Sequence, residues 1–300
     1  MPQDTERELG QFIPLHYHYV MLQDTLRVSG FQAAIQARVR VGMRVVELGG
    51  GTGILSFLAA KCGARVQCVE RNPALVETAT RLLADNGVSK QVDVIQHDAS
   101  TWVPESPVDV VVCEMLHVAM LREKQLEVIA AFKENYRAKF GDDAALPVFV
   151  PEASVLMVQA VEHNYTVADY YAPVPVFQAL DREHESTTRS ATELLPYSVI
   201  NYDETYPTEF DEQLSLEVNQ SGRINALRFI TQNALAVDVE KQAATSWPNQ
   251  ALIMPLEHSI NASAGDQLEV GFAYHAGDSL EQLAASIQCH HQAAQYRRAA

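Results

Sequence analysis

The chain has 300 residues, of which 47% are hydrophobic and 20% are charged, so it can bury a core and is not a disordered chain. Its formal net charge of −16 disfavours general binding to nucleic-acid phosphates or to anionic membranes. No run of about 18 apolar residues occurs, and no membrane span is predicted.

Two features bear on the cellular compartment. The first ten residues are polar and acidic and lack the apolar stretch of a signal peptide. The four cysteines form no CxxC pair, which predicts reduced thiols in a cytoplasmic protein and no structural zinc. We expect a cytoplasmic protein.

The first 40 residues predict a helical segment. A cluster of histidines and tyrosines, HYHY at 16–19, precedes a helical pattern that runs from Val20 to about Val39. His16 and His18 have a spacing that can chelate a metal, but no third ligand accompanies them, so no metal site is predicted.

Residues 41–148 alternate short apolar runs with helical stretches, which is typical of a parallel sheet covered on both faces. This pattern predicts an α/β, Rossmann-like domain. The expected strands are 43–48, 65–70, 91–97 and 108–113, and the expected helices are 53–62, 73–86 and 120–138.

Residues 149–300 show a different pattern, in which strands are separated by turn residues without a strong helical run. This predicts an antiparallel, β-barrel-like or sandwich-like second domain. The expected strands are 155–161, 214–218, 226–231, 251–255 and 268–273. The polar, tyrosine-bearing stretch 164–195, called the arm segment below, predicts a long excursion from this domain.

The strongest motif is a glycine loop, VVELGGGTGILSF at 45–57. Gly49, Gly51 and Gly53 follow a buried strand that carries Glu47, and a helix begins directly after them. Small residues let the backbone approach a ligand, and the helix N-terminus presents free N–H groups. A nicotinamide-binding loop needs glycine at position 54, which is Ile54, and the remaining alternative is a tight turn that binds nothing.

Three acids follow the later strands of the predicted sheet. Glu70 closes the second strand, where a carboxylate can accept hydrogen bonds from ribose hydroxyls. Asp98 follows the third strand, where it can accept from an adenine amino group beside the backbone of Ala99. Glu114 ends the fourth strand, at the edge where open parallel sheets bind ligands. The alternative for Glu70 and Asp98 is that they are surface carboxylates.

These residues resemble the class I S-adenosylmethionine-dependent methyltransferases, and three segments resemble the cofactor domain of the protein arginine methyltransferases. The segments are VVELGGGTGILSFLAAKCGA, CVE and VDVVVCEML. The resemblance implies S-adenosylmethionine as cofactor, held by the glycine loop and the acids named above. It extends to a helix in which His18, Met21, Leu22, Asp24 and Arg27 keep the family's spacing.

By the resemblance, Arg27 binds the cofactor's carboxylate, which the planar fork of an arginine suits. The alternative is a solvated helix arginine. The family also carries a loop with two glutamates nine residues apart, which Glu114 and Glu123 match. A continuous helix would turn about 900° between them and put them on opposite faces. Both therefore line one pocket only if a loop reverses the chain, and otherwise Glu123 faces solvent.

The part of the resemblance that concerns the substrate contains departures. Ser246 stands where the family has the histidine of its Thr-His-Trp loop, Met115 stands where it has a tryptophan, and its Tyr-Phe-x-x-Tyr element is replaced by FIPLHYHY. We expect Tyr17, His18 and Tyr19 to form an aromatic lid that orients a ligand, with plain packing as the alternative.

Three functions are consistent with this sequence. The first is methylation of a small amino-acid-like substrate, with methionine S-methylation preferred because a thioether sheds no proton and the rebuilt segment resembles bacterial methionine S-methyltransferases. The second is arginine N-methylation, on protein or on free arginine, and the third is a non-catalytic scaffold that binds the cofactor. By resemblance, the arm segment grips a second copy and gives a homodimer.

Overall fold

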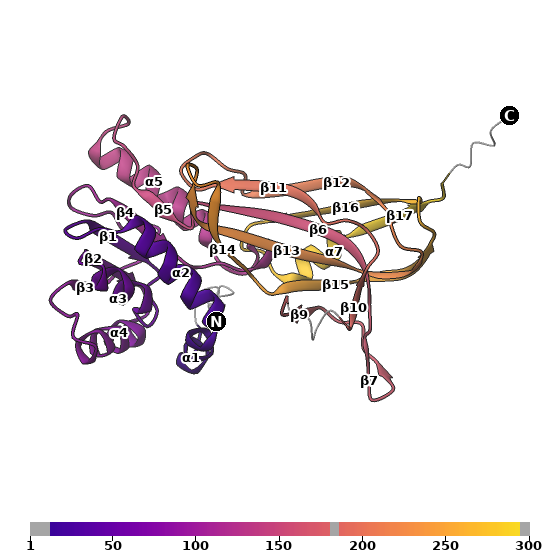
Figure 1. Ribbon diagram of the computed structural model, residues 1–300, viewed down its shortest axis with the longest axis horizontal. Coiled ribbons are helices and arrows are strands. Elements are labelled where there is room, and N and C mark those ends of the chain that lie inside the picture. The colour runs from indigo at the N-terminus through magenta and orange to yellow at the C-terminus, as the bar shows by residue number, and fades with distance from the viewer. Residues whose placement is uncertain (1–12, 181–185, 295–300) are drawn as a thin grey trace, which may run out of the picture.

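The computed structural model of the chain describes residues 13–180 and 186–294, and Figure 1 shows a helix-rich half followed by an elongated half made of strands. The first ten residues, expected not to be a signal peptide, lie outside these ranges. Within the described ranges, no helix is long and apolar enough to cross a membrane.

The helix-rich half contains a five-stranded parallel sheet in the order β3-β2-β1-β4-β5, which confirms the predicted Rossmann-like α/β fold. Its central strands are buried along nearly their whole length, and all four residues of β4 are buried. The strands are β1 (Arg44–Leu48), β2 (Arg65–Glu70), β3 (Val92–Gln96), β4 (Val110–Cys113) and β5 (Val148–Val150). The helices between them are α3 (Ile54–Lys61), α4 (Pro73–Asp85) and α5 (Gln125–Phe140).

Helix α5 begins later than the expected residue 120. The preceding residues include a short 3-10 turn, η1 (Val118–Met120), and Ala119, Met120 and Arg122 have positive φ angles of 57°, 56° and 63°. An α-helix cannot pass through residues in that region. The chain therefore makes a loop between β4 and α5.

The single helix expected from Val20 to about Val39 is two helices, α1 (Leu15–Gln23) and α2 (Thr25–Arg38). Asp24 separates them because its side chain accepts a hydrogen bond from the backbone N–H of Arg27 at 2.9 Å and so caps α2. Helix α2 buries Phe31 and Ile35 against α3 and strands of the second half.

The second half is antiparallel, as predicted, and resembles a β-barrel. Its largest sheet has the order β10-β6-β13-β15-β9, with β11 joined to β6 and β14 to β13, and a smaller sheet has the order β12-β16-β17. The strands are β6 (Ala153–His163), β9 (Val176–Gln178), β10 (Thr188–Ser190), β11 (Leu195–Asn201), β12 (Glu209–Glu217), β13 (Gly222–Asp238), β14 (Ala243–Pro248), β15 (Ala251–Ala262), β16 (Gln267–His275) and β17 (Gln288–Gln292). One short helix that the sequence pattern did not predict, α7 (Leu280–Ser286), precedes β17.

Aromatic side chains join the two sheets of this half. Tyr197 of β11 lies edge-on to Phe210 of β12, to Phe229 of β13 and to Phe272 of β16, with ring centroids 5.1–6.4 Å apart. Edge-to-face rings of this kind stabilise a core beyond the area that they bury. The inner faces of the two sheets therefore share one packed interior.

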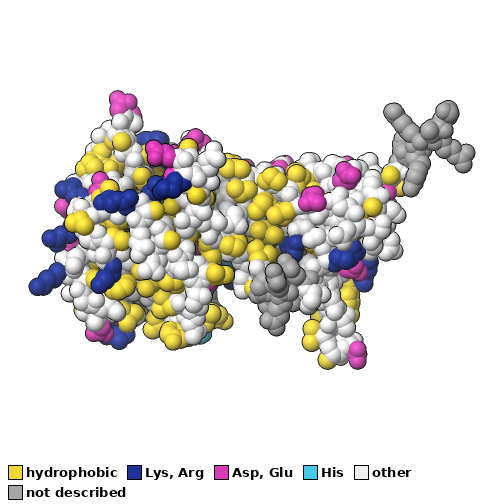
Figure 2. Space-filling view, in the orientation of Figure 1, with side chains coloured by type: hydrophobic (Ala, Val, Ile, Leu, Met, Phe, Trp, Pro, Cys, Tyr) yellow, Lys and Arg dark blue, Asp and Glu magenta, His cyan; other side chains and the backbone are white. Residues whose placement is uncertain are grey.

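The arm segment leaves the barrel as a two-stranded hairpin, β7 (Thr166–Val167) and β8 (Tyr170–Tyr171), which projects away from it in Figure 1. Its apolar side chains are open to solvent: Val167 is 73% exposed and Tyr170 is 74% exposed. Figure 2 shows hydrophobic side chains along this projection.

Gly53 and Gly87 offer a matched test of how α3 is held on the sheet. Both have positive φ, at 81° and 75°, but a Cβ at Gly53 would lie 3.1 Å from Leu83 of α4, whereas a Cβ at Gly87 would meet nothing within 4 Å. We expect Gly53→Ala to lower the free energy of unfolding by about 1–3 kcal/mol, because strain and overpacking combine, and Gly87→Ala to show the strain alone. Urea denaturation measures both, and equal losses would show that Gly53 has no packing role.

Candidate active site

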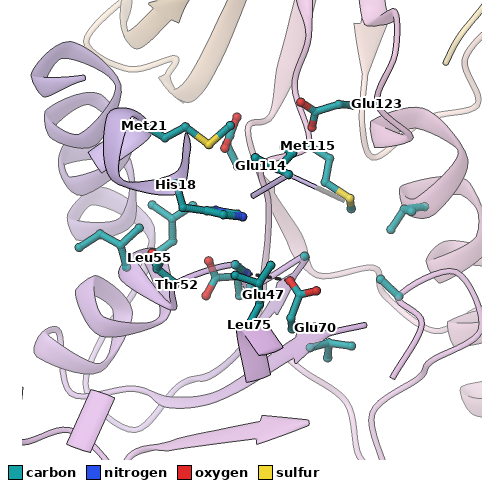
Figure 3. Close-up of a pocket in the computed structure, with 18 of the residues that line it drawn as sticks. His18, Met21, Glu47, Thr52, Leu55, Glu70, Leu75, Glu114, Met115 and Glu123 are labelled. Atoms are coloured by element: carbon teal, nitrogen blue, oxygen red, sulfur yellow. Dashed lines mark hydrogen bonds between the residues drawn. The ribbon is translucent and has the colours of Figure 1, made fainter. Parts of the chain in front are cut away.

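A cavity opens at the carboxyl ends of β1, β2 and β4, between the sheet, the helices α1 and α2, and the loop that follows Glu114 (Figure 3). This is the edge at which open α/β sheets bind their ligands. Of the predicted site residues, His18, Arg27, Glu47, Gly49, Gly51, Glu70, Asp98, Ala99, Glu114 and Glu123 line it.

The glycine loop forms the floor of the cavity. Gly51 has a φ of 54°, and a Cβ there would lie 3.2 Å from the His18 ring. Gly49 is equally close to the thioether of Met115, whose sulfur would lie 3.2 Å from an added Cβ. Gly53 was predicted to bind the cofactor, but it does not line the cavity, because it caps α3 and faces Leu83 of α4. Its missing side chain permits helix packing rather than ligand contact.

Glu47 supports the glycine loop through hydrogen bonds to the helix that follows it. Its carboxylate accepts hydrogen bonds from the backbone N–H of Ser56, at 2.9 Å, and from the Ser56 hydroxyl. Burial raises the pKa of Glu47 to about 7, against the lowering effect of these bonds. Glu47 therefore fixes the start of α3 beside the loop.

Glu70 presents its carboxylate at the end of β2. One oxygen accepts from the backbone N–H of Gly51 at 2.9 Å, and the other accepts from the N–H of Asn72 at 2.7 Å. Asp98 lies at the rim, where it accepts from Ser100 and pairs with Arg71 at 3.2 Å. Burial acts to raise the pKa of Asp98, but the hydrogen bonds from Ser100, together with Arg71, lower it below its usual range.

The predicted aromatic lid is corrected by the structure. His18 points into the cavity, and burial lowers its pKa. Tyr17 and Tyr19 do not line the cavity and are 55% and 63% exposed. Successive helix residues are turned by about 100°, so an inward His18 sends both neighbours toward solvent.

Glu114 and Arg27 form an ion pair inside the cavity. The Glu114 side chain is 8% exposed and the Arg27 side chain is 19% exposed. The Arg27 guanidinium also lies over the ring of Trp247, 5.5 Å from its centroid, and burial lowers its pKa. Sequence reasoning expected a cofactor partner for Arg27 and missed the role of Trp247, whose signal was its place in the Thr-Ser-Trp loop.

Glu123 reaches the same cavity, so the interpretation of a solvent-facing helix residue is wrong. The chain reverses through the positive-φ residues Ala119, Met120 and Arg122 and brings Glu123 back toward Glu114. Burial raises the pKa of Glu123 to about 7, while Arg27 and Arg122 act to lower it. The cavity therefore brings Glu114 and Glu123 together beside the buried guanidinium of Arg27.

The residues present fit S-adenosylmethionine. Gly51 leaves space that a Cβ would fill, Glu70 offers a carboxylate for ribose hydroxyls, and Arg27 can bind a carboxylate. The Nε2 atom of His18 is buried without a hydrogen-bond partner, which a ligand can supply. Among the described residues, no group of three His, Cys, Asp or Glu side chains is arranged to hold a metal ion.

Comparisons with known proteins agree with this geometry. Residues 45–138 match a family described as a methyltransferase domain. An uncharacterized protein of Methanothermobacter thermautotrophicus is 30% identical over 90% of this chain and 97% of its own length. The arginine N(omega)-methyltransferase of Streptomyces achromogenes is 32% identical over 40% of this chain and 34% of its own length.

Among solved structures, the Trypanosoma brucei PRMT1 enzyme–prozyme heterotetrameric complex with AdoHcy superimposes with a TM-score of 0.69. The match is 17% identical and covers 92% of this chain and 96% of that chain, so both halves of the fold are shared. The chain shares a family with the archaeal protein along nearly its whole length and is a class I S-adenosylmethionine-dependent methyltransferase that resembles the protein arginine methyltransferases.

Proposed function

We propose that the chain methylates a guanidinium nitrogen and acts as an arginine N-methyltransferase. The observation that carries this proposal is that Glu114 and Glu123 both line the cavity. Arg27 pairs with Glu114, and Glu123 stands beside them with Arg27 and Arg122 as its charged neighbours, so the two acids offer a place for a further cation. A buried carboxylate needs a cation or hydrogen bonds, and a substrate guanidinium brings both.

A methionine thioether, the acceptor that the sequence favoured first, suits this cavity less well. Its sulfur is neutral before the reaction, and its amino group brings a cation to only one of the two carboxylates. The relative from Streptomyces achromogenes is an arginine N(omega)-methyltransferase, and the superimposed structure is a PRMT1 complex. Both names support a guanidinium acceptor, which can belong to free arginine or to a peptide.

Bound S-adenosylmethionine supplies an electrophilic methyl group on a sulfonium. Arg27 would hold the carboxylate of the cofactor, and Glu114 would then be available to hold the substrate guanidinium by charge-assisted hydrogen bonds. Glu123 faces the same group from the returning loop. As the N–CH3 bond forms, the S–CH3 bond breaks, the electron pair stays on sulfur and a proton leaves the nitrogen.

Glu123 is suited to receive that proton, because its pKa of about 7 matches the pH at which such transfers are efficient. The His18 ring lies against Gly51, and its Nε2 atom is buried without a hydrogen-bond partner. Positioning of the two reactants and exclusion of water supply the rest of the acceleration.

The proposal is tested by offering the protein and S-adenosylmethionine three acceptors separately: L-arginine, an arginine-rich peptide and L-methionine. Mass spectrometry is expected to find one added methyl group on arginine, in the free amino acid or in the peptide. Methylation of L-methionine alone would overturn the proposal and restore the thioether alternative.

The first prediction concerns Glu70. Removing its carboxylate deletes the acceptor for the ribose hydroxyls, so Glu70→Ala is expected to weaken S-adenosylmethionine binding by about 1–3 kcal/mol. Isothermal titration calorimetry measures the affinity, and Glu77→Ala on the exposed face of α4 serves as the control. Unchanged affinity in Glu70→Ala would place the cofactor elsewhere.

The second prediction concerns the protonation of Glu123. Its pKa is raised to about 7, so the carboxylate form that holds a guanidinium accumulates as the pH rises through 7. We expect kcat/KM for arginine to rise with pH across that range, and Glu123→Gln to remove this rise and to lower kcat/KM by about 10²–10⁴-fold.

The exposed Glu134 of α5 provides the control, because Glu134→Gln removes the same charge away from the cavity. A rise near pH 7 that persists in Glu123→Gln would show that another group titrates. Equal rates for wild type and Glu123→Gln would remove Glu123 from the mechanism.

We further propose that the chain forms a homodimer through the arm segment. The hairpin exposes Val167 and Tyr170, and helices α1 and α2 expose an apolar set. That set consists of Leu15, Tyr17, Tyr19, Val20 and Leu26, which are 50–74% exposed. Two apolar surfaces of this kind on one chain suit a two-fold contact in which each hairpin covers the helices of the other copy.

Charge on the hairpin should therefore separate the copies. We expect the double change Val167→Asp and Tyr170→Asp to convert a dimer to a monomer in light scattering at micromolar concentration. Val239→Asp, at another strongly exposed valine on the β13–β14 turn, is expected to leave the dimer intact. A wild-type monomer with full activity would refute the dimer.

A further inference from the structure

The loop from Glu114 to Glu123 is not held by regular secondary structure. It contains the short turn η1 and three non-glycine residues at positive φ, two of them within η1, and this backbone conformation persists only where the surroundings impose it. Glu114 and Glu123 stand at the ends of this loop. Its support therefore decides where they point.

Gln125 supplies support on both sides of Glu114. It is the first residue of α5 and is 1% exposed. Its side-chain oxygen accepts from the backbone N–H of Met115 at 2.8 Å, and its side-chain nitrogen donates to the backbone C=O of Cys113 at 2.9 Å. One amide thus clamps the residues immediately before and after Glu114.

The clamp continues into the barrel as a chain of buried polar side chains. Burial raises the pKa of the Tyr202 hydroxyl, the neighbouring Gln125 amide acts to lower that pKa, and this hydroxyl lies 2.9 Å from the hydroxyl of Ser154. Ser154 donates to Asn233 at 2.7 Å, and Asn233 donates to the side-chain oxygen of Asn249 at 2.9 Å. These side chains are at most 8% exposed.

The chain returns to the same loop. Asn249 donates to the backbone C=O of Leu116 at 3.1 Å. Thr231, which is fully buried, accepts from the backbone N–H of Ala119 at 2.8 Å. Side chains from α5 and from the barrel therefore hydrogen-bond the backbone of Cys113, at the end of β4, and that of Met115, Leu116 and Ala119 in the loop.

We propose that Gln125 is a positioning residue for Glu114. In this proposal, the buried polar side chains from Gln125 to Asn249 fix the position of the Glu114 carboxylate relative to the barrel. This proposal rests on the proposed function, in which Glu114 holds the guanidinium. Gln125 touches neither substrate nor cofactor in this role. It acts by fixing the backbone that carries Glu114, and a displacement of about 1 Å at such a site can cost 10²-fold in rate.

Two variants separate the clamp from general packing. Gln125→Met keeps the shape of the side chain and removes both hydrogen bonds. Gln125→Glu restores them only when protonated, because the neutral carboxyl can donate to Cys113 and accept from Met115, whereas the ionised form repels the Cys113 carbonyl. Its activity relative to wild type at the same pH is therefore expected to rise as the pH falls.

Asn225 provides a matched control in the barrel. It is 4% exposed and clamps a backbone in the same manner, accepting from the N–H of His163 at 2.8 Å and donating to its C=O at 2.9 Å. Asn225→Leu removes an equivalent pair of hydrogen bonds, those to His163, and Asn225 does not contact the loop. It is expected to lower thermal stability without a specific loss of turnover.

The experiment measures kcat and KM on the acceptor that wild-type protein methylates, the affinity for S-adenosylhomocysteine, the melting temperature and amide hydrogen exchange at Met115. Gln125→Met is expected to lower kcat/KM by about 10–100-fold, to keep S-adenosylhomocysteine affinity within about twofold and to expose the Met115 amide to exchange. The proposal is overturned if the Met115 amide stays protected, if Gln125→Met retains full kcat/KM, or if Asn225→Leu loses as much activity.

Failure of the proposed function is distinguishable from failure of this inference. If the wild-type protein methylates L-methionine instead of arginine, the guanidinium proposal fails, but the same variants test the clamp on that acceptor. Hydrogen exchange at Met115 needs no acceptor and decides whether Gln125 fixes the loop. A pH-independent deficit in Gln125→Glu would also contradict the clamp.

Discussion

The pairing of Arg27 with Glu114 beside Glu123 is the interaction on which the arrangement of the active site depends. Ionised groups leave water at a high cost unless partners replace the lost hydration. Arg27 comes from helix α2, Glu114 follows β4 directly, and Glu123 lies at the end of the loop that precedes α5. Three segments that are separate in the sequence must therefore meet at one point, and Trp247 of β14 covers the guanidinium there.

This requirement explains why the barrel is part of the active site although it supplies none of the three charges. The loop between the two glutamates must reverse within nine residues, which its own backbone achieves only through left-handed conformations. Side chains of the barrel stabilise that strained backbone. The Thr231 hydroxyl accepts a hydrogen bond from the N–H of Ala119, and Asn249 donates one to the C=O of Leu116. A parallel sheet alone would hold the cofactor but would leave the acceptor carboxylates without a fixed position.

Local patterns predicted the parallel sheet because strands such as β4 are buried apolar runs and helices such as α4 bury one apolar face. The same patterns missed what tertiary contacts decide. Asp24 divides the N-terminal helix because its side chain caps the next one, and α5 starts later than expected because Ala119, Met120 and Arg122 have positive φ angles. The outward direction of Tyr17 and Tyr19 follows only once His18 is known to face Gly51. Gly53 belonged to the motif, but its packing against Leu83 could not be seen without α4 in place.

The charge in the cavity also constrains the acceptor. Glu114 already holds a guanidinium, that of Arg27, so a guanidinium can satisfy this carboxylate. When the carboxylate of the cofactor engages Arg27, Glu114 and Glu123 lose part of their compensation, and a cationic acceptor restores it before any bond is broken. A neutral acceptor gains positive charge only as the methyl group arrives, so the two carboxylates would stay poorly compensated in the bound state. Burial raises the pKa of Glu123 to about 7, so its ionised form at neutral pH depends on cations beside it. Under the proposed function, the acceptor brings a cation into this cavity and releases a proton there, and a guanidinium does both.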